Sequence, residues 1–105
     1  MGPSEARQRF DELFVLDVRE PREWALGRAD GSVHIPMGEL GARQGELPSD
    51  RTILCVCRSG SRSAFVTKAL RDAGYAAENL DGGLKAWARE GHPLVGDGGG
   101  EGIVA

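Results

Sequence analysis

Residues 52–63 read TILCVCRSGSRS and join an apolar run to a short run of small, polar and basic residues. The apolar part, residues 52–56, has the strongest strand pattern in the chain. Amphipathic spacing over residues 61–73 predicts a helix that ends at Gly74. Four side chains of this helix are expected to be available for packing: Ala64, Phe65, Ala69 and Leu70. The chain is therefore expected to pass from a strand through a tight loop into a helix.

Strand and helix signals keep alternating on both sides of this segment. We expect further strands at residues 14–18, 33–35 and 75–80. Helices are expected at residues 5–13, 22–26 and 84–89, with one or two helical turns at residues 37–43. Ser4 is the expected N-cap of the first helix, and Pro21 is expected to open the second. This alternation predicts an α/β domain, in which a small parallel sheet is flanked by helices on both faces.

Length and composition predict one globular domain. The chain has 105 residues, of which 40% are hydrophobic and 28% are charged. We expect residues 1–95 to form this domain. Residues 96–105 are rich in glycine and have few apolar side chains to bury, so they are predicted to be a flexible tail.

Charge and hydropathy exclude several classes of partner. Thirteen Lys and Arg residues against sixteen Asp and Glu residues give a formal net charge of −3. This balance argues against nucleic acid or an anionic membrane surface as the main partner. No apolar run is long enough to span a bilayer, and no export signal opens the chain. A cytoplasmic location is therefore expected, and free thiols at Cys55 and Cys57 suit a reducing compartment.

The loop after the strand carries the strongest chemical signal. Cysteine reacts as its thiolate, and Cys57 directly precedes a loop that leads into a helix N-terminus. Backbone N–H groups and a helix N-terminus both favour negative charge. Gly60 allows a tight turn, and the neighbouring side chains add hydroxyl donors and positive charge: Arg58, Ser59, Ser61, Arg62 and Ser63. The sequence therefore predicts an anion pocket at Cys57.

The other candidate ligands lack such surroundings. Cys55 is expected to be a core residue, as most unactivated cysteines are. A zinc site at Cys55 and Cys57 is disfavoured, because structural zinc takes four ligands and His34 and His92 are distant in sequence. Both histidines are expected to be structural or solvated.

Four motifs together resemble those of the single-domain rhodaneses. In order they are Asp17-Val18-Arg19-Glu20-Pro21 with Trp24, His34-Ile35-Pro36, Cys57-Arg58-Ser59-Gly60-Ser61-Arg62-Ser63, and Leu80-Asp81-Gly82-Gly83-Leu84 with Ala86-Trp87. Their order and spacing agree with the family over residues 14–95, and four motifs in register are far more specific than one glycine pattern.

The resemblance implies both a fold and an activity. The fold is a small parallel sheet flanked by helices. The activity is transfer of sulfane sulfur from a small anionic donor, thiosulfate or a similar compound, through a persulfide on Cys57. The acceptor would be cyanide, a thiol or a protein. Neither a metal nor an organic cofactor would be needed.

The resemblance also suggests roles for the neighbouring residues. Arg58 is expected to attract the donor, while residues 59–62 cradle the sulfur through their backbones. Arg62 is expected either to face the substrate or to pair with a carboxylate that locks the loop. Asp17 and Arg19 are expected to support the loop together with Ser63. Both tryptophans are expected to pack rather than to bind substrate, and the two glycines at residues 82–83 to shape a turn near the loop mouth.

Two departures from the family pattern affect the fold prediction. Residues 27–32 read GRADGS, where many relatives have Gly-His-Ile-Pro-Gly-Ala, so this loop is expected to differ in shape. Relatives often begin with an edge strand, whereas the residues before Val15 have a helical pattern here. We therefore expect four main strands.

Three alternative functions follow from the same loop. A cysteine phosphatase or arsenate reductase is disfavoured, because those enzymes place five residues between the cysteine and the arginine, whereas four separate Cys57 from Arg62. They also typically have histidine where this chain has Val56. A non-catalytic rhodanese-like binding module typically lacks the cysteine. A persulfide carrier that serves a protein partner in thiolation or sulfide oxidation shares the same chemistry and stays open.

Overall fold

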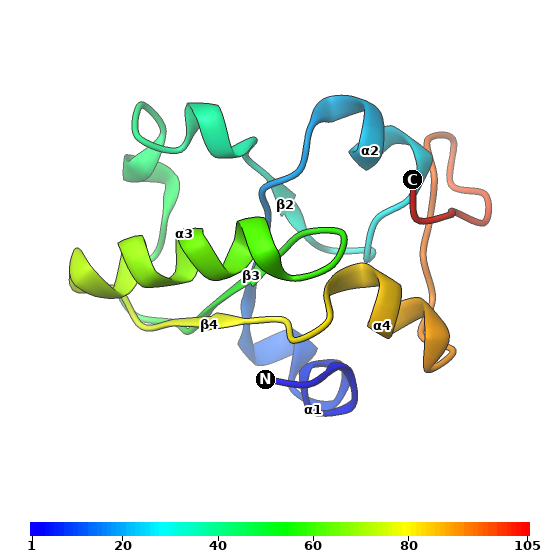
Figure 1. The fold of residues 1–105 in the computed structure, drawn as a ribbon, viewed down its shortest axis with the longest axis horizontal. Coiled ribbons are helices and arrows are strands. Elements are labelled where there is room, and N and C mark those ends of the chain that lie inside the picture. Colours follow the sequence, from blue (N-terminus) through cyan, green and yellow to red (C-terminus); the bar gives the residue numbers. More distant parts are fainter.

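Four parallel strands form the sheet at the centre of the computed structural model, which describes residues 1–105 (Figure 1). The strands are β1 (Phe14–Asp17), β2 (Val33–His34), β3 (Ile53–Val56) and β4 (Ala77–Asn79), in the order β2-β1-β3-β4. Every neighbouring pair is parallel. The α/β class, the parallel sheet and the expected number of main strands are confirmed.

Four α-helices connect and cover these strands. They are α1 (Pro3–Gln8), α2 (Pro21–Leu26), α3 (Ser61–Asp72) and α4 (Gly83–Arg89), and three short 3₁₀ turns occupy Phe10–Glu12, Met37–Glu39 and Gln44–Glu46. The first helix is shorter than predicted. Gly2 rather than Ser4 is its N-cap, because Pro3 takes the first helical position, where its missing N–H costs nothing. Pro21 opens α2 as predicted.

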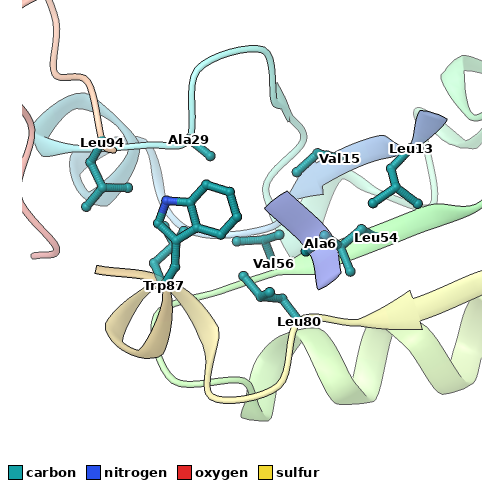
Figure 2. Packing of buried hydrophobic residues seen from close by; sticks show 10 residues of the cluster. Ala6, Leu13, Val15, Ala29, Leu54, Val56, Leu80, Trp87 and Leu94 are labelled. Atoms are coloured by element: carbon teal, nitrogen blue, oxygen red, sulfur yellow. The ribbon is translucent and has the colours of Figure 1, made fainter. Parts of the chain in front are cut away.

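The two faces of the sheet bury separate cores. Val15, Leu54 and Val56 point to the face covered by α1 and α4, where Trp87 is buried among them (Figure 2). Leu16 and Cys55 point to the opposite face, which α3 covers. This alternation follows from the two-residue period of a strand, and it places helices on both faces as expected.

The buried face of α3 differs from the predicted one. Its buried residues are Ser63, Val66, Thr67 and Leu70, whereas Phe65 is 71% exposed and Ala64 and Ala69 are also exposed. The buried face therefore carries two hydroxyl groups, which an apolar pattern does not reveal. Both find partners: Thr67 Oγ1 donates to Ser63 O at 2.8 Å, and Ser63 is bonded in the site described below.

Residues 96–105 lie against α2. The N–H of Ile103 donates to Leu26 O at 2.9 Å, and a Cβ on Gly27 would collide with Ile103 O. The predicted flexibility of this segment concerns its motion and stays a prediction. No helix is both long enough and apolar enough to cross a membrane.

Candidate active site

Cys57 lies at the carboxyl end of β3, where a tight loop turns the chain into α3. The residue is buried, and the loop reverses direction at Gly60, whose φ of +102° is in the left-handed region that favours glycine. Ligand sites of parallel sheets gather at this edge. The predicted passage from strand through loop to helix is confirmed.

The Cys57 sulfur accepts hydrogen bonds from the loop and from the first turn of α3. Gly60 N lies 3.1 Å from Sγ, Ser63 N 3.4 Å and Ser63 Oγ 3.2 Å. Burial acts to raise the pKa of the Cys57 thiol, but these bonds, with a further one from Ser59 N, outweigh it and lower the pKa below 9.0. The site thus favours a thiolate or another anionic sulfur species at this position.

Asn79, at the end of β4, braces the loop and was not anticipated from the sequence. Its Oδ1 accepts from Ser63 Oγ at 2.6 Å, and its Nδ2 donates to Gly60 O at 3.2 Å. Since the Ser63 hydroxyl has one hydrogen, Asn79 and the Cys57 sulfur compete for it. A polar residue at the end of the strand beside β3 is the sequence signal that points to Asn79.

Arg62 pairs with a carboxylate, which is the second of its two expected arrangements. Its guanidinium makes a bidentate ion pair with Glu23 of α2, at 2.7 and 2.8 Å. Hydrogen bonds from Arg62 are the main reason that the pKa of Glu23 falls from 4.5 to about 2, even though burial opposes this change. The pair ties the first turn of α3 to α2. Glu23 was not anticipated either, because it is 39 residues away in sequence.

Asp17 and Arg19 support the site by way of α2. The two residues form a fully buried ion pair at 2.7 Å. Arg19 also donates to Glu23 O at 3.2 Å and to Gly27 O at 2.7 Å, so it holds the end of α2. Because α2 carries Glu23, the support reaches the loop through Arg62.

The remaining loop side chains face solvent. Arg58, Ser59 and Ser61 are exposed. The Arg58 Nε donates to Ala105 O at 2.5 Å.

The start of α4 closes the other side of the loop. Leu84 N donates to Cys57 O, and Lys85 N donates to Arg58 O, both at 2.9 Å. Gly83 makes this approach possible, because a Cβ there would lie 2.5 Å from Arg58 O and 2.6 Å from Cys57 O. Gly82 and Gly83 both have positive φ, and the predicted turn beside the loop is confirmed.

The other predicted core and packing residues fall where expected. Cys55 is buried, and burial raises the pKa of its thiol to about 11. Trp24 stacks on His34 with ring centroids 4.7 Å apart, and His34 Nε2 lies 2.7 Å from Arg19 O. Cys57 is therefore the one cysteine whose surroundings favour a thiolate.

Comparison with known proteins places the chain in a family. A model of the rhodanese-like domain matches residues 2–90, so the chain belongs to the rhodanese-like domain family. A sulfurtransferase of Allochromatium vinosum is 38% identical over 86 residues, which cover 81% of this chain and 80% of that protein. This chain is thus similar to proteins named sulfurtransferases, as its four motifs predicted.

Solved structures share the fold. A rhodanese-related protein from Thermoplasma volcanium is 32% identical to this chain, and the two superpose with a TM-score of 0.87. The superposition covers 90% of this chain and 95% of that one. A thiosulfate sulfurtransferase from Pseudomonas aeruginosa is 25% identical, with a TM-score of 0.84; it covers 100% of this chain and 22% of that longer one.

Proposed function

We propose that this protein moves the outer sulfur of thiosulfate, or of a similar anionic donor, to a thiophilic acceptor through a persulfide on Cys57. The observation that carries the proposal is the set of donors on the Cys57 sulfur: Gly60 N, Ser63 N and Ser63 Oγ, all within 3.4 Å. Donors arranged in this way stabilise a thiolate before the reaction and an anionic persulfide after it.

Loading begins with the Cys57 thiolate. The thiolate attacks the outer sulfur of thiosulfate, an S–S bond forms to Cys57, and the S–S bond inside thiosulfate breaks. Sulfite leaves as a dianion with the bonding electron pair, and the negative charge moves to the outer sulfur of the persulfide. The lowered pKa of Cys57 supplies the thiolate for this step.

Unloading regenerates the thiolate. An acceptor attacks the outer sulfur, the S–S bond to Cys57 breaks, and Cys57 leaves as a thiolate. Cyanide would give thiocyanate, and a thiol would give a persulfide of its own; in a reducing cytoplasm, thiols and proteins are the abundant acceptors. Both steps are completed without a metal or an organic cofactor, and they predict ping-pong kinetics.

The surrounding charges support the same chemistry. Arg58 is exposed next to Cys57 and can attract the sulfonate end of a donor. Arg62 is held by Glu23 and therefore serves to fix the first turn of α3, whose N–H and hydroxyl groups reach the sulfur.

Intact mass spectrometry after incubation with thiosulfate tests the proposal. The protein should gain one sulfur atom and lose it again to cyanide. Cys57→Ser should abolish the gain, whereas Cys55→Ser, the matched control, should keep it. No gain in the folded protein would reject thiosulfate as a donor and favour a binding module, and equal loss in both variants would reject Cys57 as the specific carrier. Release of phosphate from p-nitrophenyl phosphate would instead support the disfavoured phosphatase reading.

A further inference from the structure

Three cations line one hollow beside the cysteine loop. The hollow has a volume of about 400 Å³, and we call it the basic hollow. Its lining includes Arg58, Lys85 and Arg89 together with the apolar side chains of Leu94, Ile103 and Val104. No aspartate or glutamate lines it. It therefore combines positive charge with an apolar wall.

Lys85 and Arg89 have no carboxylate partner, unlike most other cations in the chain. Arg43 pairs with Glu39 and Glu46, and Lys68 pairs with Asp72 one helical turn away. Lys85 and Arg89 make no ion pair within 4.0 Å, whereas Arg58 already donates a hydrogen bond to Ala105 O.

Two of the three cations lie one turn apart on α4. Lys85 and Arg89 lie four residues apart, a spacing at which like charges destabilise a helix. The whole chain carries a formal net charge of −3, so the positive charge here is a local feature. An unneutralised basic cluster attracts an anionic partner, and its field speeds the encounter.

The basic hollow adjoins the proposed sulfur carrier. Arg58 directly follows Cys57, and Lys85 N donates to Arg58 O at 2.9 Å. In Figure 1, α4 and the C-terminal segment lie at the same end of the molecule as the loop that leads into α3. A partner seated in the hollow would thus have its neighbouring residues close to the loop.

We propose that the basic hollow docks an acidic, partly apolar peptide segment of a protein that receives sulfur from Cys57. Carboxylates would meet Lys85 and Arg89, and apolar side chains would cover Ile103, which is 61% exposed, and the half-buried Val104. The apolar wall favours a peptide over the uniformly polar backbone of a nucleic acid. The proposal rests on the proposed function, because the docked protein is the thiol acceptor. Its thiol gives its proton to the outer sulfur of the persulfide, and the acceptor sulfur then attacks that atom. A new S–S bond forms on the acceptor, the S–S bond to Cys57 breaks, and Cys57 leaves as a thiolate with the bonding electron pair.

Binding tests the surface independently of sulfur chemistry. Three fluorescently labelled peptides of equal length would be titrated against the full chain, each with two leucines and either four glutamates, four glutamines or four lysines. The glutamate peptide should bind about tenfold more tightly than the glutamine peptide, and the lysine peptide should not bind. Lys85→Glu with Arg89→Glu should remove the preference, and Lys85→Gln with Arg89→Gln should reduce it. Arg7→Glu, a reversal of another exposed and unpaired arginine, should leave it unchanged.

Transfer tests the role of the surface in the reaction. The chain is loaded to completion with thiosulfate, and loss of sulfur from Cys57 is followed by quenched mass spectrometry with cysteine-containing versions of the same peptides. The ratio of rates for glutamate and glutamine peptides should fall about tenfold from the unsubstituted chain to the Lys85→Glu, Arg89→Glu variant. Each peptide has the same thiol reactivity with both proteins, so a difference between the two rate ratios reports on the surface alone.

Three outcomes would overturn the inference. One is equal binding of the glutamate and glutamine peptides, and another is an equal loss of preference in Arg7→Glu. The third is tighter binding of a single-stranded oligonucleotide of matched charge, which would assign the hollow to nucleic acid. Failure of thiosulfate to load Cys57 would instead count against the proposed function, while the binding titration would still decide the surface.

Discussion

The Ser63 hydroxyl offers the sharpest test of how the loop activates Cys57. Its Oγ lies 3.2 Å from the sulfur and 2.6 Å from Asn79 Oδ1, and its single hydrogen serves one acceptor at a time. Ser63→Ala removes this donor but leaves the N–H groups of Gly60 and residue 63 in place. The pKa of Cys57 should therefore rise, because burial then opposes ionisation with one fewer hydrogen bond against it.

The size of the rise follows from the strength of one hydrogen bond. A hydrogen bond to a charged group contributes about 1.5–3 kcal/mol, and about 1.4 kcal/mol corresponds to one pKa unit. An unshared hydroxyl would thus be worth between about 1 and 2 pKa units. Because Asn79 holds the shorter bond, we expect the lower end, a rise of about 1 unit. The rate of alkylation at pH 7 should fall by up to about tenfold as the thiolate fraction falls.

The pKa is measured from the pH dependence of iodoacetamide alkylation, with Cys57 followed by mass spectrometry. Ser61→Ala is the control, since it removes an exposed hydroxyl from the same loop. Asn79→Ala gives the opposite expectation: the Ser63 hydroxyl then has only the sulfur to bond, so the pKa of Cys57 should fall. An unchanged pKa in Ser63→Ala would refute the assigned hydrogen bond. A raised pKa in Asn79→Ala would show that its bond to Gly60 O matters more than its competition for the hydroxyl.

Three further predictions concern the supports of the loop. The pKa of Glu23 in the folded protein is about 2, below its ordinary value of 4.5. Its ionised form therefore stabilises the fold fully above pH 4.5, and this stabilisation is lost as the pH falls toward 2. The free energy of unfolding should drop by up to about 3 kcal/mol over this pH range. Measured by denaturant titration at each pH, it should change less with pH in Glu23→Gln than in the unsubstituted protein. The same pH dependence in both proteins would contradict the pairing. Gly83→Ala should lower the midpoint of thermal unfolding more than Gly74→Ala. Both positions have positive φ, but only a Cβ at residue 83 would lie 2.5 Å from Arg58 O. Equal decreases in the two variants would argue against that close approach. Arg58→Ala should raise the KM for thiosulfate while kcat changes little, because attraction between Arg58 and the sulfonate group stabilises the bound substrate and the transition state equally. A decrease confined to kcat in steady-state assays would assign Arg58 another role.

Local sequence patterns predicted most of the fold and the central residue of the site. Continuous apolar runs identified β1 and β3, and Pro21 marked the start of α2. Gly60 was predicted to turn the loop, and its φ of +102° agrees. These signals depend on neighbouring residues, so they can be recognised before the chain is folded.

The buried face of α3 was misjudged because burial there is not set by hydropathy alone. The helix offers an apolar group at Phe65 that is left 71% exposed, while the hydroxyl-bearing Ser63 and Thr67 are buried. Their burial is favourable because each hydroxyl has a hydrogen-bond partner. Those partners are known only once the helix is docked.

Sequence by itself determined that this is a parallel α/β domain with a tight loop between a strand and a helix at Cys57, because strand periodicity and turn chemistry are local properties. Only the tertiary structure decided what supports that loop. Glu23 reaches Arg62 across 39 residues, and Asn79 reaches Gly60 across 19. The physical reason is the strand order β2-β1-β3-β4, which places β4 beside β3, while the buried pair of Asp17 and Arg19 at the end of β1 anchors α2. The partners of each polar side chain follow from that order and not from spacing along the chain.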